Sequence, residues 1–175
     1  ILTKSLDNTA RIWDTNSGKI IAVIGDKNFP VYDAEFSPDE KTFLTFSYYT
    51  LKIWEVRSGK LLHEFNNQSD FIYSATFSES GKRIITTAWE PFTKIWESET
   101  GKLVFTIISL NNSDYITQIQ SGYYQTTPAA AKLLHYVTKD LKVITFEQLD
   151  VKYNRPDKVL EAIGNTDTAL IKSYR

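Results

Sequence analysis

Apolar and polar residues alternate in short runs that recur along the first part of the chain. Residues 31–36 and 72–77 both alternate, both end at Phe-Ser, and both lead into a polar turn. Such alternation is typical of a β-strand with one buried face. Each run is followed by further short apolar stretches, which we expect to be strands: 42–46, 51–55 and 60–65, and then 83–87, 93–97 and 102–108. The pattern therefore predicts sets of four short strands joined by turns.

A phrase repeated three times lies in the third strand of these sets. It reads Arg11-Ile12-Trp13-Asp14, Lys52-Ile53-Trp54-Glu55 and Lys94-Ile95-Trp96-Glu97, and a Ser/Thr-Gly-Lys turn follows each time. The tryptophans are 41 and then 42 residues apart. A repeat of about 40–45 residues with a Trp followed by an acid is typical of the four-stranded blades of a β-propeller. We expect Trp13, Trp54 and Trp96 to be structural residues packed between blades, and the glycines to supply positive φ in tight turns.

On these residues, the chain from position 1 to about 110 resembles WD40 repeats. The resemblance implies a partial β-propeller of four-stranded antiparallel blades. It also implies a hydrogen-bonded network of the Trp, a Ser or Thr, an Asp in the turn before the Trp strand, and a His. Asp7 matches that Asp, whereas the turns at 47–50 and 88–91 have none, and the sequence contains no Gly-His pair. We therefore expect the network to be lost and the blades to depend on apolar packing.

After Ile108 the pattern changes. Residues 115–120 resemble another first strand, Thr127 followed by Pro128 and an Ala run predicts a short helix, and 143–146 predicts a strand. Asp157 as N-cap and Gly164 as C-terminal stop predict a helix between them, with another after Asn165. The fold class is all-β, a partial propeller followed by a mixed α/β segment with short helices. We expect blades over 1–110 with the first one truncated, a divergent last blade or transition segment over 111–150, and a helical linker over 151–175.

The resemblance also implies where a partner docks. In propellers of this kind partners bind the face that holds the start of the first strand and the turn before the Trp strand. The matching positions here are Leu6, Pro30, Tyr32, Phe71, Tyr73, Trp89 and Tyr115. Tyr and Trp are the residues most often found at binding hot spots, so we interpret this set as a patch for a protein or peptide. The alternative, that the rings only cover the edges of blades, stays open.

The amino-acid composition excludes several kinds of ligand and site. A net charge of -1 provides no basic field for nucleic acid, and no apolar run is long enough for a membrane span. The absence of cysteine removes disulfides and thiolate sites, and we expect a cytoplasmic protein. His63 and His135, the only two histidines, lack ligand spacing, so we expect no metal and no cofactor. With no catalytic constellation, the chain is expected to be non-enzymatic.

The sequence contains no methionine and opens on an apolar strand, so we expect a fragment that contacts missing blades and a downstream domain. Residues 114–170, with Gly122-Tyr123-Tyr124 and Tyr153-Asn154-Arg155-Pro156-Asp157, are similar to bacterial proteins in which a WD40 propeller precedes a caspase-like cysteine peptidase. This resemblance implies a second function, the regulatory portion of such a peptidase. Arg155 and Asp157 are expected to be structural, as an ion-paired side chain and a helix cap. A third interpretation is a hydrolase site in the central channel. Such a site needs carboxylates or histidines on the innermost strands, and those strands carry apolar and hydroxyl residues instead.

Overall fold

The computed structural model describes residues 1–5, 7–25, 30–65, 71–89, 91–137 and 143–175. These residues form two compact units. The first comprises Ile1–Glu90 and Ile95–Lys102, and the second comprises Pro91–Lys94 and Leu103–Arg175.

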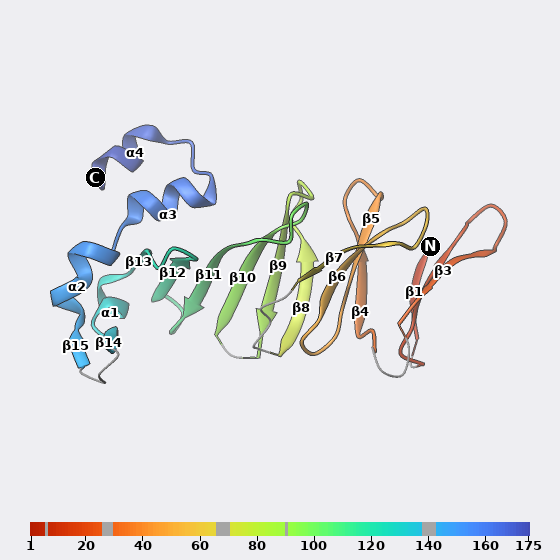
Figure 1. Ribbon diagram of the computed structural model, residues 1–175, viewed down its shortest axis with the longest axis horizontal. Coiled ribbons are helices and arrows are strands. Elements are labelled where there is room, and N and C mark those ends of the chain that lie inside the picture. Colours follow the sequence, from red (N-terminus) through yellow and green to blue (C-terminus); the bar gives the residue numbers. More distant parts are fainter. Residues whose placement is uncertain (6, 26–29, 66–70, 90, 138–142) are drawn as a thin grey trace. The chain divides into compact units, whose positions relative to one another are not determined.

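The first unit consists of antiparallel sheets whose strands follow the chain order (Figure 1). One sheet holds β1 (Leu2–Lys4), β2 (Ala10–Trp13) and β3 (Ile20–Ile24). The next holds β4 (Asp33–Phe36), β5 (Thr42–Phe46), β6 (Leu51–Glu55) and β7 (Leu61–Phe65). A further sheet begins with β8 (Ile72–Phe77), β9 (Arg83–Ala88) and β10 (Phe92–Glu97). The predicted partial propeller of antiparallel blades is confirmed.

The tryptophan strands share an irregularity that the hydrophobic pattern does not show. The pairing of β2 with β3 shifts register between Ile12 and Trp13, and the pairing of β6 with β7 shifts between Ile53 and Trp54. A bulge of this kind bends the strand and increases its twist. The same distortion therefore recurs at the same place in two successive sheets.

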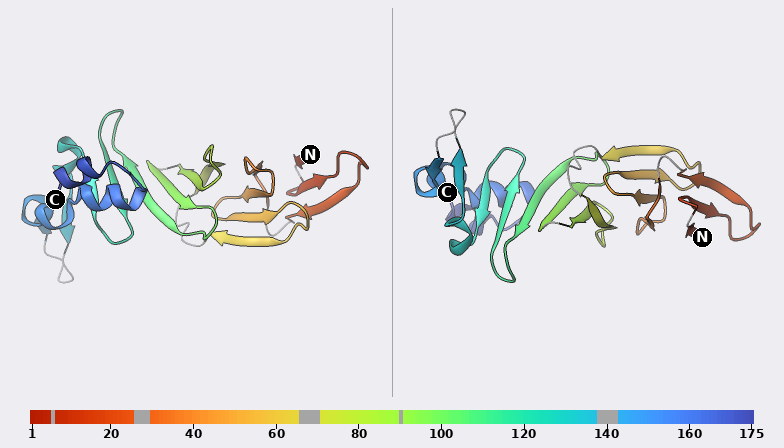
Figure 2. Two further views of the ribbon diagram at one scale, coloured as in Figure 1. Left: turned by 90° about the horizontal axis from the view of Figure 1, so that it is seen from above. Right: turned by 90° about the horizontal axis from the view of Figure 1, so that it is seen from below.

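The first two sheets bury one apolar core. They lie side by side in both views of Figure 2, and the buried residues come from both. This core consists of Ala10, Ile12, Ile24, Val31 and Phe43. Trp54 packs against the same core and stacks on Phe43, with ring centroids 6.3 Å apart. Trp96 meets Phe65 edge-to-face at 5.7 Å, so tryptophans at the repeated position contact aromatic rings inside the unit.

The recurring turns explain why an acid follows each Trp. The carboxylate of Asp14 accepts hydrogen bonds from the Ser17 amide (2.7 Å) and hydroxyl (2.8 Å). Glu55 accepts one from the Ser58 hydroxyl in the next turn, and Glu97 accepts one from Thr100. Gly18, Gly59 and Gly101 then take φ values of 66°, 66° and 70°, which confirms the predicted turn conformation.

The prediction that the Trp-centred polar network is lost is wrong for one of its bonds. The indole N–H of Trp13 donates to Thr3 Oγ1 (2.8 Å), that of Trp54 donates to Thr45 Oγ1 (2.9 Å), and that of Trp96 donates to Thr86 Oγ1 (2.9 Å). Each threonine lies on the strand that precedes the Trp strand and pairs with it, so the hydrogen bond links these two neighbouring strands. Asp7 bonds elsewhere, to Thr9 and to Arg11.

The second unit contains three successive antiparallel strands, β11 (Leu103–Ser109), β12 (Tyr115–Ile119) and β13 (Tyr124–Thr126). It continues with α1 (Pro128–Ala131), β14 (His135–Val137), β15 (Val143–Thr145), α2 (Phe146–Tyr153), α3 (Pro156–Ile163) and α4 (Thr168–Ser173). The sequence pattern predicted a strand over 143–146 and no helix after it, whereas in the structure α2 begins at Phe146. No helix among the described residues has the length and apolar character needed to cross a membrane.

His135 is exposed at the start of β14, because α1 ends at Ala131. Two expectations for this unit need correction. Asp157 is not the N-cap of α3: Arg155 occupies that position, and Asp157 lies buried in the first turn. Thr127 precedes α1 as predicted, but its hydroxyl donates to Asp114 (2.8 Å) and not to the helix.

The ends of the last helices follow their sequence signals. Gly164 ends α3 in the left-handed conformation at φ 82°, and the carboxylate of Asp167 caps α4 by accepting from the Leu170 amide (2.9 Å). The predicted end of α3 at Gly164 is therefore confirmed, as is the presence of a helix after Asn165.

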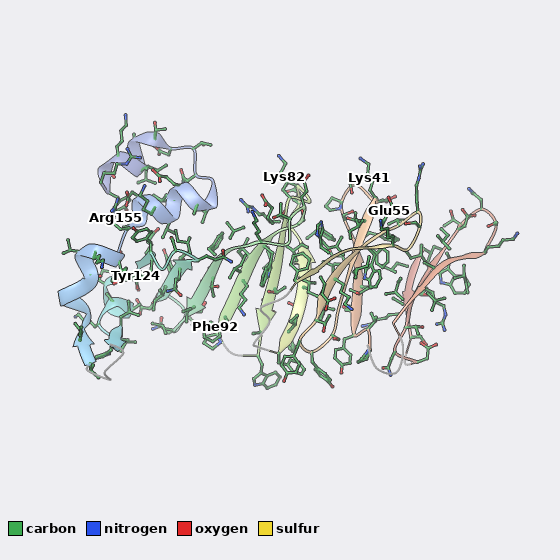
Figure 3. The ribbon with its side chains drawn as sticks, viewed as in Figure 1. Lys41, Glu55, Lys82, Phe92, Tyr124 and Arg155 are labelled. Atoms are coloured by element: carbon green, nitrogen blue, oxygen red, sulfur yellow. The ribbon has the colours of Figure 1, made fainter. Side chains whose placement is uncertain are left out.

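Helix α3 is held against the sheet of its own unit. The Arg155 amide donates to the Tyr124 carbonyl (2.9 Å), and the Tyr124 hydroxyl donates to Asp150 (2.7 Å), with Arg155 beside Tyr124 in Figure 3. Arg155 clamps Asp157 through two hydrogen bonds of 2.8 and 2.6 Å. This clamp holds the pKa of the Asp157 carboxyl below its usual range. Residues 154–163 are therefore part of the packed unit.

Candidate functional site

The topology of the first unit separates its loops into two groups. In antiparallel sheets the start of one strand and the end of the next lie at the same end. The starts of β4, β6 and β8 and the ends of β5, β7 and β9 therefore share one end, which we call the loop end. The Ser/Thr-Gly-Lys turns lie at the opposite end, the turn end, where Figure 3 labels Lys41, Glu55 and Lys82.

Aromatic side chains gather at the loop end. Tyr32 precedes β4, Tyr48 and Tyr49 lie between β5 and β6, and Trp89 follows β9. Phe71 and Tyr73 lie at the start of β8. We call this set the aromatic surface: Tyr32, Tyr48, Tyr49, Phe71, Tyr73 and Trp89.

Ring contacts connect most of these side chains. The ring centroid of Tyr48 is 4.2 Å from that of Tyr32 and 4.5 Å from that of Phe71, and Tyr49 lies 6.2 Å from Phe71. Tyr73 and Trp89 form a second pair at 6.2 Å with their planes 64° apart. The Trp89 amide donates to the Phe71 carbonyl (3.2 Å), so the backbone joins the two groups.

The aromatic surface is open to solvent. Trp89 is 79% exposed, Tyr73 66%, Tyr49 58% and Tyr48 45%. Backbone hydrogen bonds connect the residues beside these rings: the Ile72 amide donates to the Tyr48 carbonyl (2.6 Å) and the Tyr32 amide donates to the Phe46 carbonyl (2.9 Å). Exposed rings beside a hydrogen-bonded backbone resemble a binding surface, since less ordering is needed when a partner docks.

The charges near the aromatic surface are paired with one another. Lys4 lies 3.3 Å from Asp33, Arg11 lies 2.5 Å from Asp7, and Lys52 lies 3.7 Å from Glu64; these are distances between the charged nitrogen and the carboxylate oxygen. Hydrogen bonds from Thr9 and from Arg11 hold the pKa of Asp7 well below its usual range. Burial, together with a hydrogen bond to Tyr48, raises the pKa of Tyr32 to about 12. At neutral pH, Asp7 is therefore ionised and Tyr32 is neutral.

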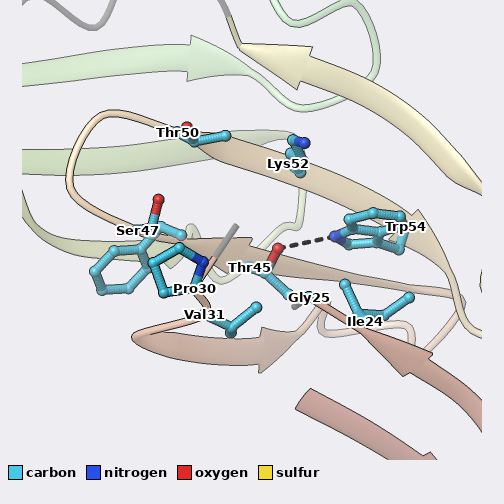
Figure 4. A pocket seen from close by; sticks show the side chains of 10 residues that line it. Ile24, Gly25, Pro30, Val31, Thr45, Ser47, Thr50, Lys52 and Trp54 are labelled. Atoms are coloured by element: carbon cyan, nitrogen blue, oxygen red, sulfur yellow. Dashed lines mark hydrogen bonds between the residues drawn. The ribbon is translucent and has the colours of Figure 1, made fainter. Parts of the chain in front are cut away.

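A pocket of about 230 Å³ opens between the first two sheets beside these loops (Figure 4). Pro30, Val31 and Phe46 give it apolar walls, and Ser47, Thr50 and Lys52, which is paired with Glu64, add polar groups. Val31 and Ser47 directly precede Tyr32 and Tyr48 in the chain, so the pocket adjoins the aromatic surface. The pocket accepts a side chain of aliphatic size.

The structure brings together four of the predicted partner-binding residues: Tyr32, Phe71, Tyr73 and Trp89. Pro30 lines the adjoining pocket, and Leu6 lies outside the described residues. Tyr115 belongs to the second unit, where it is exposed at the start of β12.

Sequence reasoning missed Tyr48 and Tyr49. The turn at 47–50 was interpreted only as one that lacks the repeat's Asp. The available signal was the alignment of the turns: Tyr48 lies 41 residues before Trp89, at the same position of the repeat, and Tyr49 follows it.

Among the described residues, no cluster of three or more His, Asp or Glu side chains has the arrangement of a metal site.

One comparison with known proteins gives a match. Residues 59–97 match the family model described as WD domain, G-beta repeat. The match begins at the Gly of one recurring turn and ends at the acid that follows Trp96. The chain therefore contains a WD40 repeat at 59–97. No curated protein matches the chain.

Proposed function

We propose that the protein is a non-catalytic interaction scaffold whose aromatic surface binds a segment of another protein. The observation that carries this proposal is the group of exposed, mutually contacting rings at the loop end, in which Tyr73 and Trp89 are the most open to solvent. The WD40 repeat at 59–97 supports the role, because such repeats generally mediate contacts between proteins.

The chemistry of the surface favours a polypeptide as the ligand. Tyr and Trp provide large rigid contact areas with a hydrogen-bonding tip, a combination enriched at protein interfaces. The adjoining pocket accepts one apolar side chain. Among the residues that the structure describes, Lys4, Arg11 and Lys52 each pair with a carboxylate, so they offer no free cationic field for a phosphate-rich ligand.

A displayed library of random peptides, selected on the full chain, tests the proposal. Selected peptides should bind the chain at least about tenfold more tightly than the Tyr73→Ala/Trp89→Ala double variant, as expected for hot-spot residues. Lys41→Ala/Lys82→Ala, at the turn end, is the matched control and should bind like the wild type. Equal affinity for all three proteins, or no enrichment of any peptide, would exclude the aromatic surface as the binding site.

We also propose that the chain belongs to a larger protein. The sheets of the first unit are too few to close a ring, since propellers have about four to eight blades. A second candidate function is the regulatory portion of a caspase-like cysteine peptidase whose catalytic domain lies beyond Arg175. It is supported by the similarity of residues 114–170 to proteins with that arrangement, and the sequence itself contains no cysteine. Extending the open reading frame past Arg175 tests it: a His and a Cys at caspase-like spacing are expected, and an unrelated continuation would exclude it.

A further inference from the structure

We propose that the partner of the aromatic surface is an uncharged, proline-rich segment in the polyproline II conformation, with one apolar side chain in the adjoining pocket. This inference rests on the proposed function, because it names the class of peptide that the same surface binds. Three features of the surface carry it: its hydrogen-bonding groups, its charge and its pocket.

The hydrogen-bonding groups of the surface are donors on aromatic rings. Within the described part of the chain, the Trp89 indole N–H and the hydroxyls of Tyr49 and Tyr73 have no hydrogen-bond partner. A polyproline II segment has no internal hydrogen bonds, so its carbonyls are free to accept, and its prolines have no N–H that needs an acceptor. The donors of the surface and the acceptors of such a segment therefore match.

The rings are also arranged to receive flat apolar groups. Tyr73 and Trp89 meet edge-to-face at 64°, which leaves open ring faces on a pair that is mostly exposed. Aromatic-lined surfaces dock proline-rich segments by packing pyrrolidine rings on such faces. Because the polyproline II conformation exists before binding, the entropy lost on docking is small.

The pairing of the described charges at the loop end favours an uncharged partner. Lys4, Arg11 and Lys52 each have a carboxylate partner at this end of the first unit, namely Asp33, Asp7 and Glu64. A charged residue of the partner would lose hydration on docking and would have to compete with these existing ion pairs. A segment rich in proline avoids that cost.

The pocket accounts for the one apolar side chain. Its volume of about 230 Å³ is smaller than the sites that hold most small-molecule ligands, about 300–1,000 Å³. Pro30 and Val31 supply apolar walls next to Tyr32, so a leucine in the segment can enter while neighbouring prolines lie on the rings. The pocket thus fixes the position of the segment along the aromatic surface.

The test uses the full chain and a fluorescently labelled proline-rich peptide with one central leucine. We expect saturable binding by fluorescence anisotropy and weakening of about tenfold or more in Trp89→Ala. Replacing the leucine of the peptide by glycine should weaken binding several-fold, roughly as expected for losing one buried aliphatic side chain. Lys41→Ala/Lys82→Ala is the control variant, and circular dichroism of each variant checks that it is folded.

Three further peptides of equal length decide between ligand classes: a Gly/Ser peptide and two proline-rich peptides that carry either glutamates or lysines. The inference is overturned if the Gly/Ser peptide binds as tightly as the proline-rich one, if either charged peptide binds more tightly, or if Trp89→Ala binds like the wild type. The library selection separates the two proposals. Selected peptides that lack proline and still require Tyr73 and Trp89 would overturn the polyproline II inference and leave the scaffold function standing.

Discussion

The two ends of the sheets in the first unit use their side chains in opposite ways. At the turn end, the same Ser/Thr-Gly-Lys turn recurs, and its polar groups bond to one another, as Asp14 with Ser17 and Glu97 with Thr100. At the loop end the loops differ in sequence, and their aromatic rings lie open to solvent. The polar groups of the recurring turns are therefore hydrogen-bonded to one another, whereas the exposed rings lie in loops whose sequences differ from one repeat to the next.

This difference separates the positions that hold the fold from those available for binding. Trp96 and Trp89 show it within one sheet: Trp96 is 1% exposed and bonded to Thr86, and Trp89 is 79% exposed. Residue type alone does not distinguish them. Their position relative to the repeat does, because only Trp96 recurs at the 41- to 42-residue spacing.

The largest expected effect comes from replacing these two tryptophans. Trp96→Ala should lower the free energy of unfolding by about 4 kcal/mol, because it empties a buried site beside Phe65. Trp89→Ala should change it by less than about 0.5 kcal/mol, because the side chain is mostly in solvent. Urea unfolding of the full chain followed by circular dichroism measures both values. A large loss of stability in Trp89→Ala would show that the loop-end rings hold the fold, and would break the comparison.

The recurring glycines allow a matched test at the turn end. Gly59 and Gly18 both have φ of 66°, but a Cβ on Gly59 would lie 2.5 Å from the Cβ of Ala22 in the neighbouring sheet, and one on Gly18 would meet nothing within 4 Å. Gly59→Ala should therefore cost about 3 kcal/mol, from backbone strain plus overpacking, and Gly18→Ala about 1 kcal/mol. The difference between their urea midpoints measures the close approach of the two sheets. Equal losses would mean that the turn end does not contribute to sheet-to-sheet packing.

Removing the Trp–Thr hydrogen bonds should lower the free energy of unfolding by less, and a buried and an exposed bond can be compared. Thr86→Val leaves the buried indole N–H of Trp96 without an acceptor, which should cost about 2 kcal/mol. Thr3→Val removes the same bond from Trp13, but there the threonine is exposed and water can replace it, so the loss should be below about 0.5 kcal/mol. Thermal unfolding of both variants compares them. A similar loss in each would show that burial does not set the value of this bond.

Much of the fold was predictable because its signals are local. Strands such as β5 (Thr42–Phe46) and β6 (Leu51–Glu55) have the predicted bounds, since short apolar runs bounded by turn residues define a strand directly. Two features were not predictable. Asp157 is buried because Arg155 folds back onto it, and Trp54 bonds to Thr45 because a paired strand carries the acceptor. Both depend on which residues lie side by side after folding, and that information is absent from spacing along one strand.

The candidate site was predictable to a lesser degree. Tyr32, Phe71, Tyr73 and Trp89 followed from aligning the repeats, because the start of β4 corresponds to the start of β8. Tyr48 occupies the position of Trp89 one repeat earlier, 41 residues before it, but its importance comes from contacts with Tyr32 and Phe71, which belong to different sheets. Pairings between sheets are set by the arrangement of blades, so a surface built across several loops is only partly visible in the sequence.

The smallest expected effect is a pH dependence at the loop end. Burial, with a hydrogen bond to Tyr48, raises the pKa of Tyr32 to about 12, whereas a tyrosine in an unfolded chain ionises near about 10. Because the folded state favours the neutral phenol, its contribution to stability is complete below about pH 10 and is lost as the pH rises through about 12. Tyr32→Phe keeps the ring beside Tyr48 and removes the ionisable group. Urea midpoints measured across this range should therefore fall more steeply with pH for the wild type than for Tyr32→Phe, and the ultraviolet titration of tyrosinate should lose one component that ionises near pH 12 in the variant. Parallel pH dependences for the two proteins would show that Tyr32 titrates as an ordinary exposed tyrosine, and that the aromatic surface is more open to water at its Tyr32–Tyr48 contact than the 4.2 Å ring separation indicates.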